Sequence, residues 1–441
     1  MPGDKPLIAD DVHRDLSRRF RMTRIHMVTG LAFLGPAWLS LIHAAEAITR
    51  GEWHHPSLLA AIHLFVVGYA SNVVCGAILQ IVPVVFQGRL YSIRLAYIQF
   101  VFMVLGSFSI PVGFLAKQWQ IVTAGGTSVL IAFVLLFWNL GQTARTLKKR
   151  TEALGVMATF VFLFVTVLLG LGMASGNPPI DRVTLPVHIV IGVTGWFTTL
   201  ILVLSPRLIS FFVSSHSKKL RRSRPEFLLL AGISLVAIGF VLRVEGTVAS
   251  LAMVMFLGGW ILYFTGYLQL LINLYRHFRN RRRKEVEWTL KWIVGGLYGG
   301  ILVLGVWAIV FTGFVQKWML ASSSLMDRIT LSVTLLVIFG FLQWMIGAYM
   351  AKIMPFLRRM GRYSHGSAPE TDQARKIRPP GVWDMLPRTP IVLALLGFAI
   401  GVVSLTAGVL IGQESLTLTG ATTGTAAWVL YTAAMVVMYG R

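Results

Sequence analysis

The chain has 441 residues, of which 56% are hydrophobic and only 13% are charged. Soluble domains carry about 25% charged residues, so this composition excludes a soluble globular protein and indicates a polytopic membrane protein. The net charge of +23 does not indicate nucleic-acid binding, because the basic residues gather in short loops on one side, as membrane topology requires. One cysteine excludes an internal disulfide, and the absence of C-x-x-C-H excludes covalent haem attachment.

Residues 1–23 are polar and basic, and we expect a cytoplasmic arm that runs into the first span without a signal peptide. Twelve apolar stretches follow, each long enough to cross a bilayer, which needs about 20 apolar residues per helix. The predicted fold is therefore an all-α polytopic membrane protein. The spans lie at 24–48, 57–86, 93–116, 119–142, 152–175, 184–213, 226–244, 247–273, 290–315, 325–355, 390–412 and 417–440.

The distribution of Lys and Arg predicts the orientation. The N-terminal arm and the even-numbered loops hold 34 of the 40 basic residues. Basic residues mark the cytoplasmic side of a membrane protein, so we expect both termini in the cytoplasm and the chain in the plasma (inner) membrane. The other six lie on the opposite side, at Arg50, Lys117, Arg182, Arg243, Lys317 and Arg328.

The second span, within Pro56–Phe86, has related stretches at Pro186–Phe212 and Leu331–Leu357. Each carries a proline near its inner end, and the first two carry a histidine near the outer end. This recurrence predicts three pseudo-repeats of four helices, and internal repeats commonly place binding sites in the membrane at the repeat interface. The repeats would be 24–142, 152–273 and 290–440, with a cytoplasmic loop at 356–389.

His63 and His188 are the main candidate ligands. A histidine within a span is costly in lipid, so it faces the bundle interior and finds a partner. Neutral imidazole is a common ligand of haem iron and of copper. In the alternative interpretation, each imidazole donates to a backbone carbonyl between packed helices. The sequence leaves both interpretations open.

A second cluster lies at the outer end of the first hairpin, at His43, Glu46, His54 and His55. His43 and Glu46 are three residues apart and would share a helix face. Imidazole and carboxylate ligands of this kind could bind copper or zinc near the surface. The spacing fits no known ligand motif, and histidines are also ordinary interfacial residues.

The motifs around the two histidines resemble those of the haem–copper oxidase catalytic subunit, and most closely its divergent small relatives. The similarity lies in H-L-F-V-V-G-Y (His63–Tyr69) with G-A-I-L-Q-I-V-P (Gly76–Pro83), in H-I-V-I-G-V-T-G-W (His188–Trp196) and in K-I-M-P-F-L (Lys352–Leu357). The resemblance implies twelve helices in three sets of four. It also implies that His63 ligates a low-spin haem and that His188 ligates the copper of an oxidase centre.

The chain also departs from that family. The seventh span has no histidine pair, and Thr334 stands about where the tenth span should carry H-x-H. We therefore expect no oxygen reduction. The sequence predicts an oxidase-subunit-like protein that binds b-type haem, with copper as a second candidate, and that serves electron transfer or haem or copper handling. Its partners would be the lipid bilayer and an electron carrier or other membrane subunits. The alternatives are a cofactor-free permease and a scaffold subunit.

The charge asymmetry leads to a topology test. Reporter domains fused after Gly51, Gly176 and Gln413 should report the outer side of the membrane, because each position lies in a loop poor in basic residues. Fusions in the basic loops serve as the cytoplasmic control. A cytoplasmic signal from any of the three positions would contradict the span count.

Overall fold

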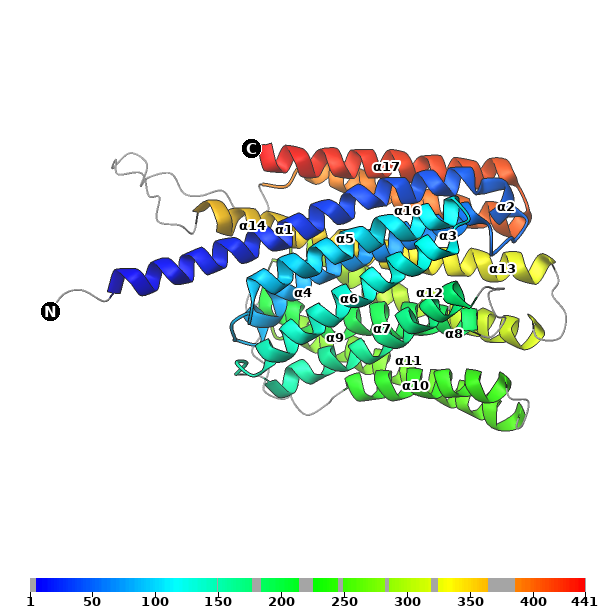
Figure 1. Ribbon diagram of the computed structural model, residues 1–441, viewed down its shortest axis with the longest axis horizontal. Helices are drawn as coiled ribbons and strands as arrows, with labels where there is room; N and C mark the ends of the chain where they lie inside the picture. Colours follow the sequence, from blue (N-terminus) through cyan, green and yellow to red (C-terminus); the bar gives the residue numbers. More distant parts are fainter. Residues whose placement is uncertain are drawn as a thin grey trace.

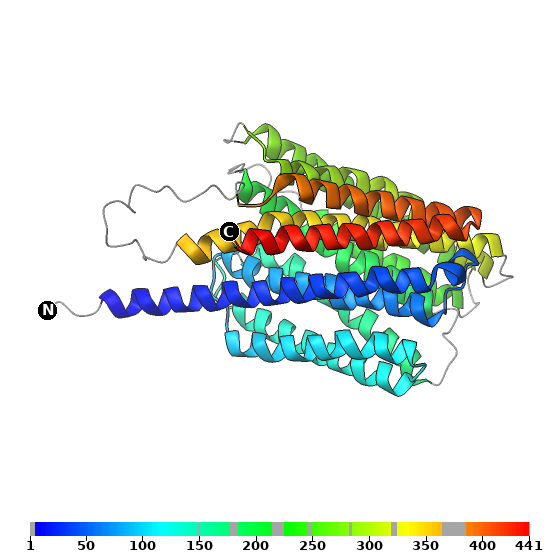
Figure 2. The same cartoon turned by 90° about the horizontal axis from the view of Figure 1, so that it is seen from above.

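The computed structural model describes residues 5–148, 150–176, 184–213, 225–244, 249–281, 285–318, 324–363 and 385–440, and every regular element in these ranges is helical. Within these ranges, twelve helices are long and apolar enough to cross a membrane, which confirms the predicted number of spans. The helices run side by side, and both ends of the chain lie at the same end of the bundle (Figures 1 and 2). The prediction that this end is cytoplasmic rests on its basic residues.

At two predicted boundaries the helix extends further than the predicted span. The first helix, α1 (Lys5–His43), begins within the predicted arm and projects beyond the other helices (Figure 1). Helix α14 (Gln343–Tyr363) continues to Tyr363, so residues 356–363 are helical and not part of the predicted loop. Arg358 and Arg359 lie in this extension. Cations are favourable near the C-terminal end of a helix. Residues 364–384 of the loop lie outside the described residues.

Three spans form the centre of the bundle. In the second, sixth and tenth spans, 72%, 83% and 72% of the most apolar stretch is buried, against at most 50% in any other span. Each of the three contains a π-helix between two α-helical parts. The second span is α3 (Pro56–His63), η1 (Leu64–Ser71) and α4 (Asn72–Val85); the sixth is α8 (Thr184–Val190), η2 (Ile191–Thr198) and α9 (Thr199–Phe212); the tenth is α13 (Ser324–Leu335), η4 (Leu336–Leu342) and α14.

Polar side chains stabilise the wide turns of two π-helices. The Ser71 and Thr198 hydroxyls each donate to the carbonyl five residues earlier, at 2.8 Å, and Thr199 does so at 2.6 Å. A π-helix is rare, appears mostly as a single wide turn within an α-helix, and is frequent at functional sites. These hydroxyls supply donors to carbonyls that water cannot reach in a bilayer.

The other nine spans surround this centre. Helices α1, α7 (Arg150–Ser175) and α12 (Trp288–Trp318) pack along the second, sixth and tenth spans respectively. The remaining six form three antiparallel hairpins at the perimeter. These are α5 (Ile93–Leu115) with α6 (Trp119–Ala144), α10 (Pro225–Val244) with α11 (Ala249–Arg279), and α16 (Arg388–Ile411) with α17 (Glu414–Gly440).

The central spans also contact one another at their inner ends through cations. Arg207 Cζ lies 5.9 Å from the ring centre of Phe86, and Lys352 Nζ lies 4.7 Å from that of Phe212. Arg207 also pairs with Glu226 of α10, and Lys352 pairs with Glu287, directly before α12. The sixth span is thereby tied to the second, and the tenth to the sixth. These pairings go beyond the interfacial anchoring that the sequence predicted for both cations.

Four helices end with a residue in the left-handed backbone region, at Gly51, Gln87, Lys117 and Gly412. At Lys117, φ is +55°. Its amide donates to the Phe114 carbonyl at 3.0 Å, and the next amide donates to the Gly113 carbonyl at 2.8 Å. This is the Schellman arrangement that usually employs glycine, because a Cβ is disfavoured at positive φ.

Replacing Lys117 with Gly should therefore stabilise the protein. We expect a gain of about 0.5–1 kcal/mol in the free energy of unfolding, because removal of the Cβ relieves the left-handed conformation. Thermal unfolding in detergent measures the change. Lys117→Ala is the matched control, since it removes the same charge but keeps the Cβ, and it should give no gain. Equal stability of both variants would contradict the argument.

Candidate functional site

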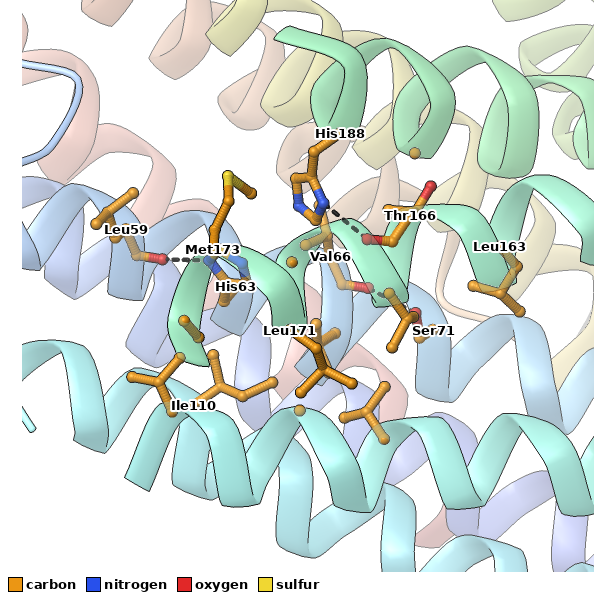
Figure 3. A pocket seen from close by; sticks show the side chains of 18 of the residues that line it. Leu59, His63, Val66, Ser71, Ile110, Leu163, Thr166, Leu171, Met173 and His188 are labelled. Carbon is orange, nitrogen blue, oxygen red and sulfur yellow. Dashed lines mark hydrogen bonds between the residues drawn. The ribbon is translucent and has the colours of Figure 1, made fainter. Parts of the chain in front are cut away.

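The two candidate histidines of the central spans face the same cavity, which has a volume of about 140 Å³. It lies between the second and sixth spans and is bounded on its other sides by α5, α6 and α7. His63 comes from the end of α3 and His188 from α8 (Figure 3). Their ring centres are 6.5 Å apart, with 23° between the ring planes. The structure thus brings together two side chains that are 125 positions apart in the sequence.

Backbone hydrogen bonds determine which nitrogen of each ring is free. Nδ1 of His63 donates to the Leu59 carbonyl, and Nδ1 of His188 donates to the Thr166 carbonyl, both at 2.8 Å (Figure 3). These are the carbonyl contacts that the packing interpretation expected. They also leave the Nε2 lone pair of a neutral imidazole available. Neither Nε2 has a hydrogen-bond partner among the described residues.

The two histidines lie at different positions relative to the π-helices of their spans. His63 directly precedes η1, whereas His188 lies three residues before η2. Their hydrogen-bond partners differ accordingly. His63 bonds to its own helix, four residues back, and His188 bonds across to α7.

Glycines allow α7 to approach the sixth span closely enough for this cross-helix bond. A Cβ added at Gly170 would lie 3.0 Å from His188 Cε1, and one at Gly192 would lie 3.0 Å from Thr166 Cγ2. A Cβ at Gly195 would lie 2.9 Å from Phe162 Cβ. The ring of His188 therefore occupies space that exists only because residue 170 has no side chain.

The walls of the cavity are apolar. None of the described residues that line it is Asp, Glu, Lys or Arg, and its polar side chains other than the histidines and the two tryptophans, Trp119 and Trp196, are Ser71 and Thr166. The ring of Phe114 lies 4.9 Å from that of His63. Both hydroxyls already donate to backbone carbonyls. The imidazole nitrogens are thus the strongest ligands that the cavity offers.

The two corresponding spaces between central spans are occupied by aromatic side chains. Between the tenth and second spans, Trp38 packs on Phe339 and Phe398 and donates to Gln343 Oε1 at 3.1 Å. Between the sixth and tenth spans, Trp307 donates to Thr334 at 3.1 Å. Its neighbours there are Trp260 and Phe311. Thr334, aligned in the sequence with an absent histidine, is a packing residue.

The sequence analysis missed a third buried histidine, His26. Its Nδ1 lies 3.3 Å from Asn72 Oδ1 and its Nε2 lies 3.2 Å from Gln99 Oε1. The Asn72 amide also donates to the Gly68 carbonyl at 2.8 Å and to Ser107 at 3.2 Å. Asn72 and Gln99 thus form the interhelical hydrogen bonds expected of polar residues within spans. A histidine inside the first predicted span was the available signal.

The outer cluster does not gather into a metal site in the described part of the chain. No group of three or more His, Cys, Asp or Glu side chains there could hold a metal ion. Glu46 instead pairs with Arg50 at 2.7 Å. The hydrogen bond to Glu52 and the charge of Glu46 raise the pKa of Arg50 above its ordinary value. The prediction of copper or zinc at His43, Glu46, His54 and His55 gains no support.

No protein-family model and no curated protein sequence matches the chain. The resemblance to haem–copper oxidases therefore depends on the quoted motifs.

The glycine contact of His188 gives a stability prediction. Gly170→Ala should lower the free energy of unfolding by about 1 kcal/mol, because overpacking outweighs the gain in helix propensity. Gly172→Ala is the matched control on the same helix, since an added Cβ there meets nothing within 4 Å. Thermal unfolding of both variants in detergent tests the difference. A Gly170→Ala protein as stable as the control would show that His188 can move freely.

Proposed function

We propose that the chain is an oxidase-subunit-like membrane protein that holds one b-type haem between His63 and His188, and that it serves electron transfer or haem handling. The observation that carries this proposal is the pair of free Nε2 atoms at one apolar cavity. Backbone hydrogen bonds orient both rings, as they do around metal-ligating histidines in general. A bound haem would supply one-electron redox chemistry.

The spacing of the rings is compatible with one metal ion between them. Two metal–nitrogen bonds of about 2.0 Å each separate opposed nitrogens by about 4 Å. The distances from each nitrogen to its ring centre account for the rest of the 6.5 Å. Packing between the two spans is therefore no obstacle to a bis-histidine site. This arrangement differs from the one that the family resemblance implied, in which the two histidines serve different metals.

The apolar lining favours haem over a bare copper ion. A metal cation with only two neutral ligands would bring an uncompensated charge into an apolar cavity, which is strongly unfavourable. The porphyrin of a haem carries two negative charges and neutralises ferrous iron. The described lining holds no cation, so haem carboxylates would have to lie at the mouth of the cavity.

The depth of the histidines supports electron exchange at the outer surface. His63 lies seven residues from the start of α3 and His188 four residues from that of α8. At 1.5 Å per residue these positions are about 10 and 6 Å below the outer ends of their helices. An electron carrier on that side would be the nearest partner. The three central spans, each interrupted by a π-helix, support the proposed three-group relation to the oxidase subunit.

An absorption spectrum of the purified protein tests this proposal. The wild type should show a Soret band and, on reduction, the split α and β bands of a six-coordinate low-spin haem. His63→Ala and His188→Ala should each abolish the low-spin spectrum, because each removes one axial ligand. His54→Ala, in the outer loop, is the control and should leave the bands unchanged. A colourless wild type would favour a permease, and haem retained in both variants would place the ligands elsewhere.

A further inference from the structure

We infer that the cavity receives its ligand sideways from the bilayer, through the seam between α6 and α7, and that Leu171 is the side chain that closes this seam. The nature of the ligand rests on the proposed function, but the route does not. It depends on the contacts of the α6–α7 wall alone.

Leu171 faces the cavity and the lipid at the same time. It lines the cavity and is only partly buried. It lies three residues after Leu168, which is 55% exposed and turned toward the lipid. Residues three apart are neighbours on one helix face. The Leu171 side chain therefore stands at the boundary between the cavity and the bilayer.

The opposing position on α6 is a glycine. A Cβ added at Gly126 would lie 2.8 Å from Leu171 Cδ2, so the tip of Leu171 occupies the place of a side chain at residue 126. Gly126 also lines the cavity. At this point the wall between cavity and lipid consists of one leucine tip resting on a glycine backbone.

Leu171 can move without a large rearrangement. Gly170 and Gly172 flank it, and glycine in a helix costs about 0.5–1 kcal/mol relative to alanine. A Cβ added at Gly172 would meet nothing within 4 Å, so no other helix packs against α7 at the residue next to the leucine. Rotamer changes of exposed side chains take picoseconds to nanoseconds. A rotation of Leu171 away from Gly126 opens the wall.

Other described walls are more firmly closed. The ring of Phe114 covers His63 at 4.9 Å and is itself held by Trp119, with 5.9 Å between ring centres. The second and sixth spans are two of the three most buried spans of the bundle. Since the described lining carries no charged side chain, the part of the ligand that enters the cavity is apolar, and the ligand is soluble in the bilayer.

The size of the cavity also indicates that one of its walls moves when a large ligand binds. A dry cavity of about 150 Å³ holds a molecule the size of benzene, and this one measures about 140 Å³. A macrocycle is larger, so it fits only if one wall yields. The α6–α7 seam is the wall that can do so, and the edge of the macrocycle would then lie in it.

Cysteine labelling tests the route independently of haem. Leu163→Cys places a thiol in the cavity, in a Cys75→Ser background. We expect lipid-soluble N-phenylmaleimide to label it about tenfold faster when Leu171→Ala is added, and more slowly with Leu171→Trp. Leu168→Ala, next to the seam but outside the lining, is the matched control. Equal rates in the Leu171 and Leu168 variants, or equally fast labelling by a charged, membrane-impermeant maleimide, would overturn the inference.

Haem uptake from lipid vesicles distinguishes this inference from the proposed function. Stopped-flow absorption should show haem b entering the Leu171→Ala protein several-fold faster than the wild type, with the same final spectrum. Labelling that depends on Leu171, without haem uptake, would refute the proposed function. It would support entry of another apolar ligand through the α6–α7 seam. Haem uptake at the same rate in both proteins, together with labelling that does not depend on Leu171, would refute only entry through the α6–α7 seam.

Discussion

The hydrogen bonds of the widened helical turns in the central spans are the constraint on which the site depends. In a bilayer each backbone group needs a partner within the protein, since water is absent. The π-helices of the second and sixth spans meet this requirement with hydroxyl donors, from Ser71 in one and from Thr198 and Thr199 in the other. Both histidines lie just before these turns. The widened turns thus set the direction in which each helix presents its imidazole, although the two histidines occupy different positions relative to them.

The electrostatics of the cavity follow from its apolar walls. An unpaired charge in such surroundings is strongly unfavourable, so each imidazole is expected to be neutral. The backbone carbonyls of Leu59 and Thr166 then select the tautomer that carries the proton on Nδ1. The same reasoning limits the ligand to a group that brings little net charge. Hydrogen bonds that look like simple helix packing therefore also prepare the two free nitrogens.

Hydropathy and charge predicted the twelve spans, because the length of each apolar stretch directly reflects the thickness of a bilayer. The same patterns placed His63 and His188 near one end of the bundle. They could not predict that the rings meet, because this depends on a close approach of α7 and the sixth span at Gly170 and Gly192. The π-helices were also beyond sequence reasoning, since their apolar residues have no distinctive pattern. His26 was missed because its partners, Asn72 and Gln99, come from two other spans.

The three spaces between the central spans are lined by different side chains. Helices α1 and α12 each carry a buried tryptophan that donates a hydrogen bond to a central span, from Trp38 to Gln343 and from Trp307 to Thr334. Helix α7 has no tryptophan, and its small residues Thr166 and Gly170 stand beside His188. A large side chain at residue 166 would reach into the cavity and gain dispersion contacts, whereas one at residue 170 would displace the ring of His188. At these two positions a large α7 side chain is absent from the space in which the two imidazole nitrogens are free.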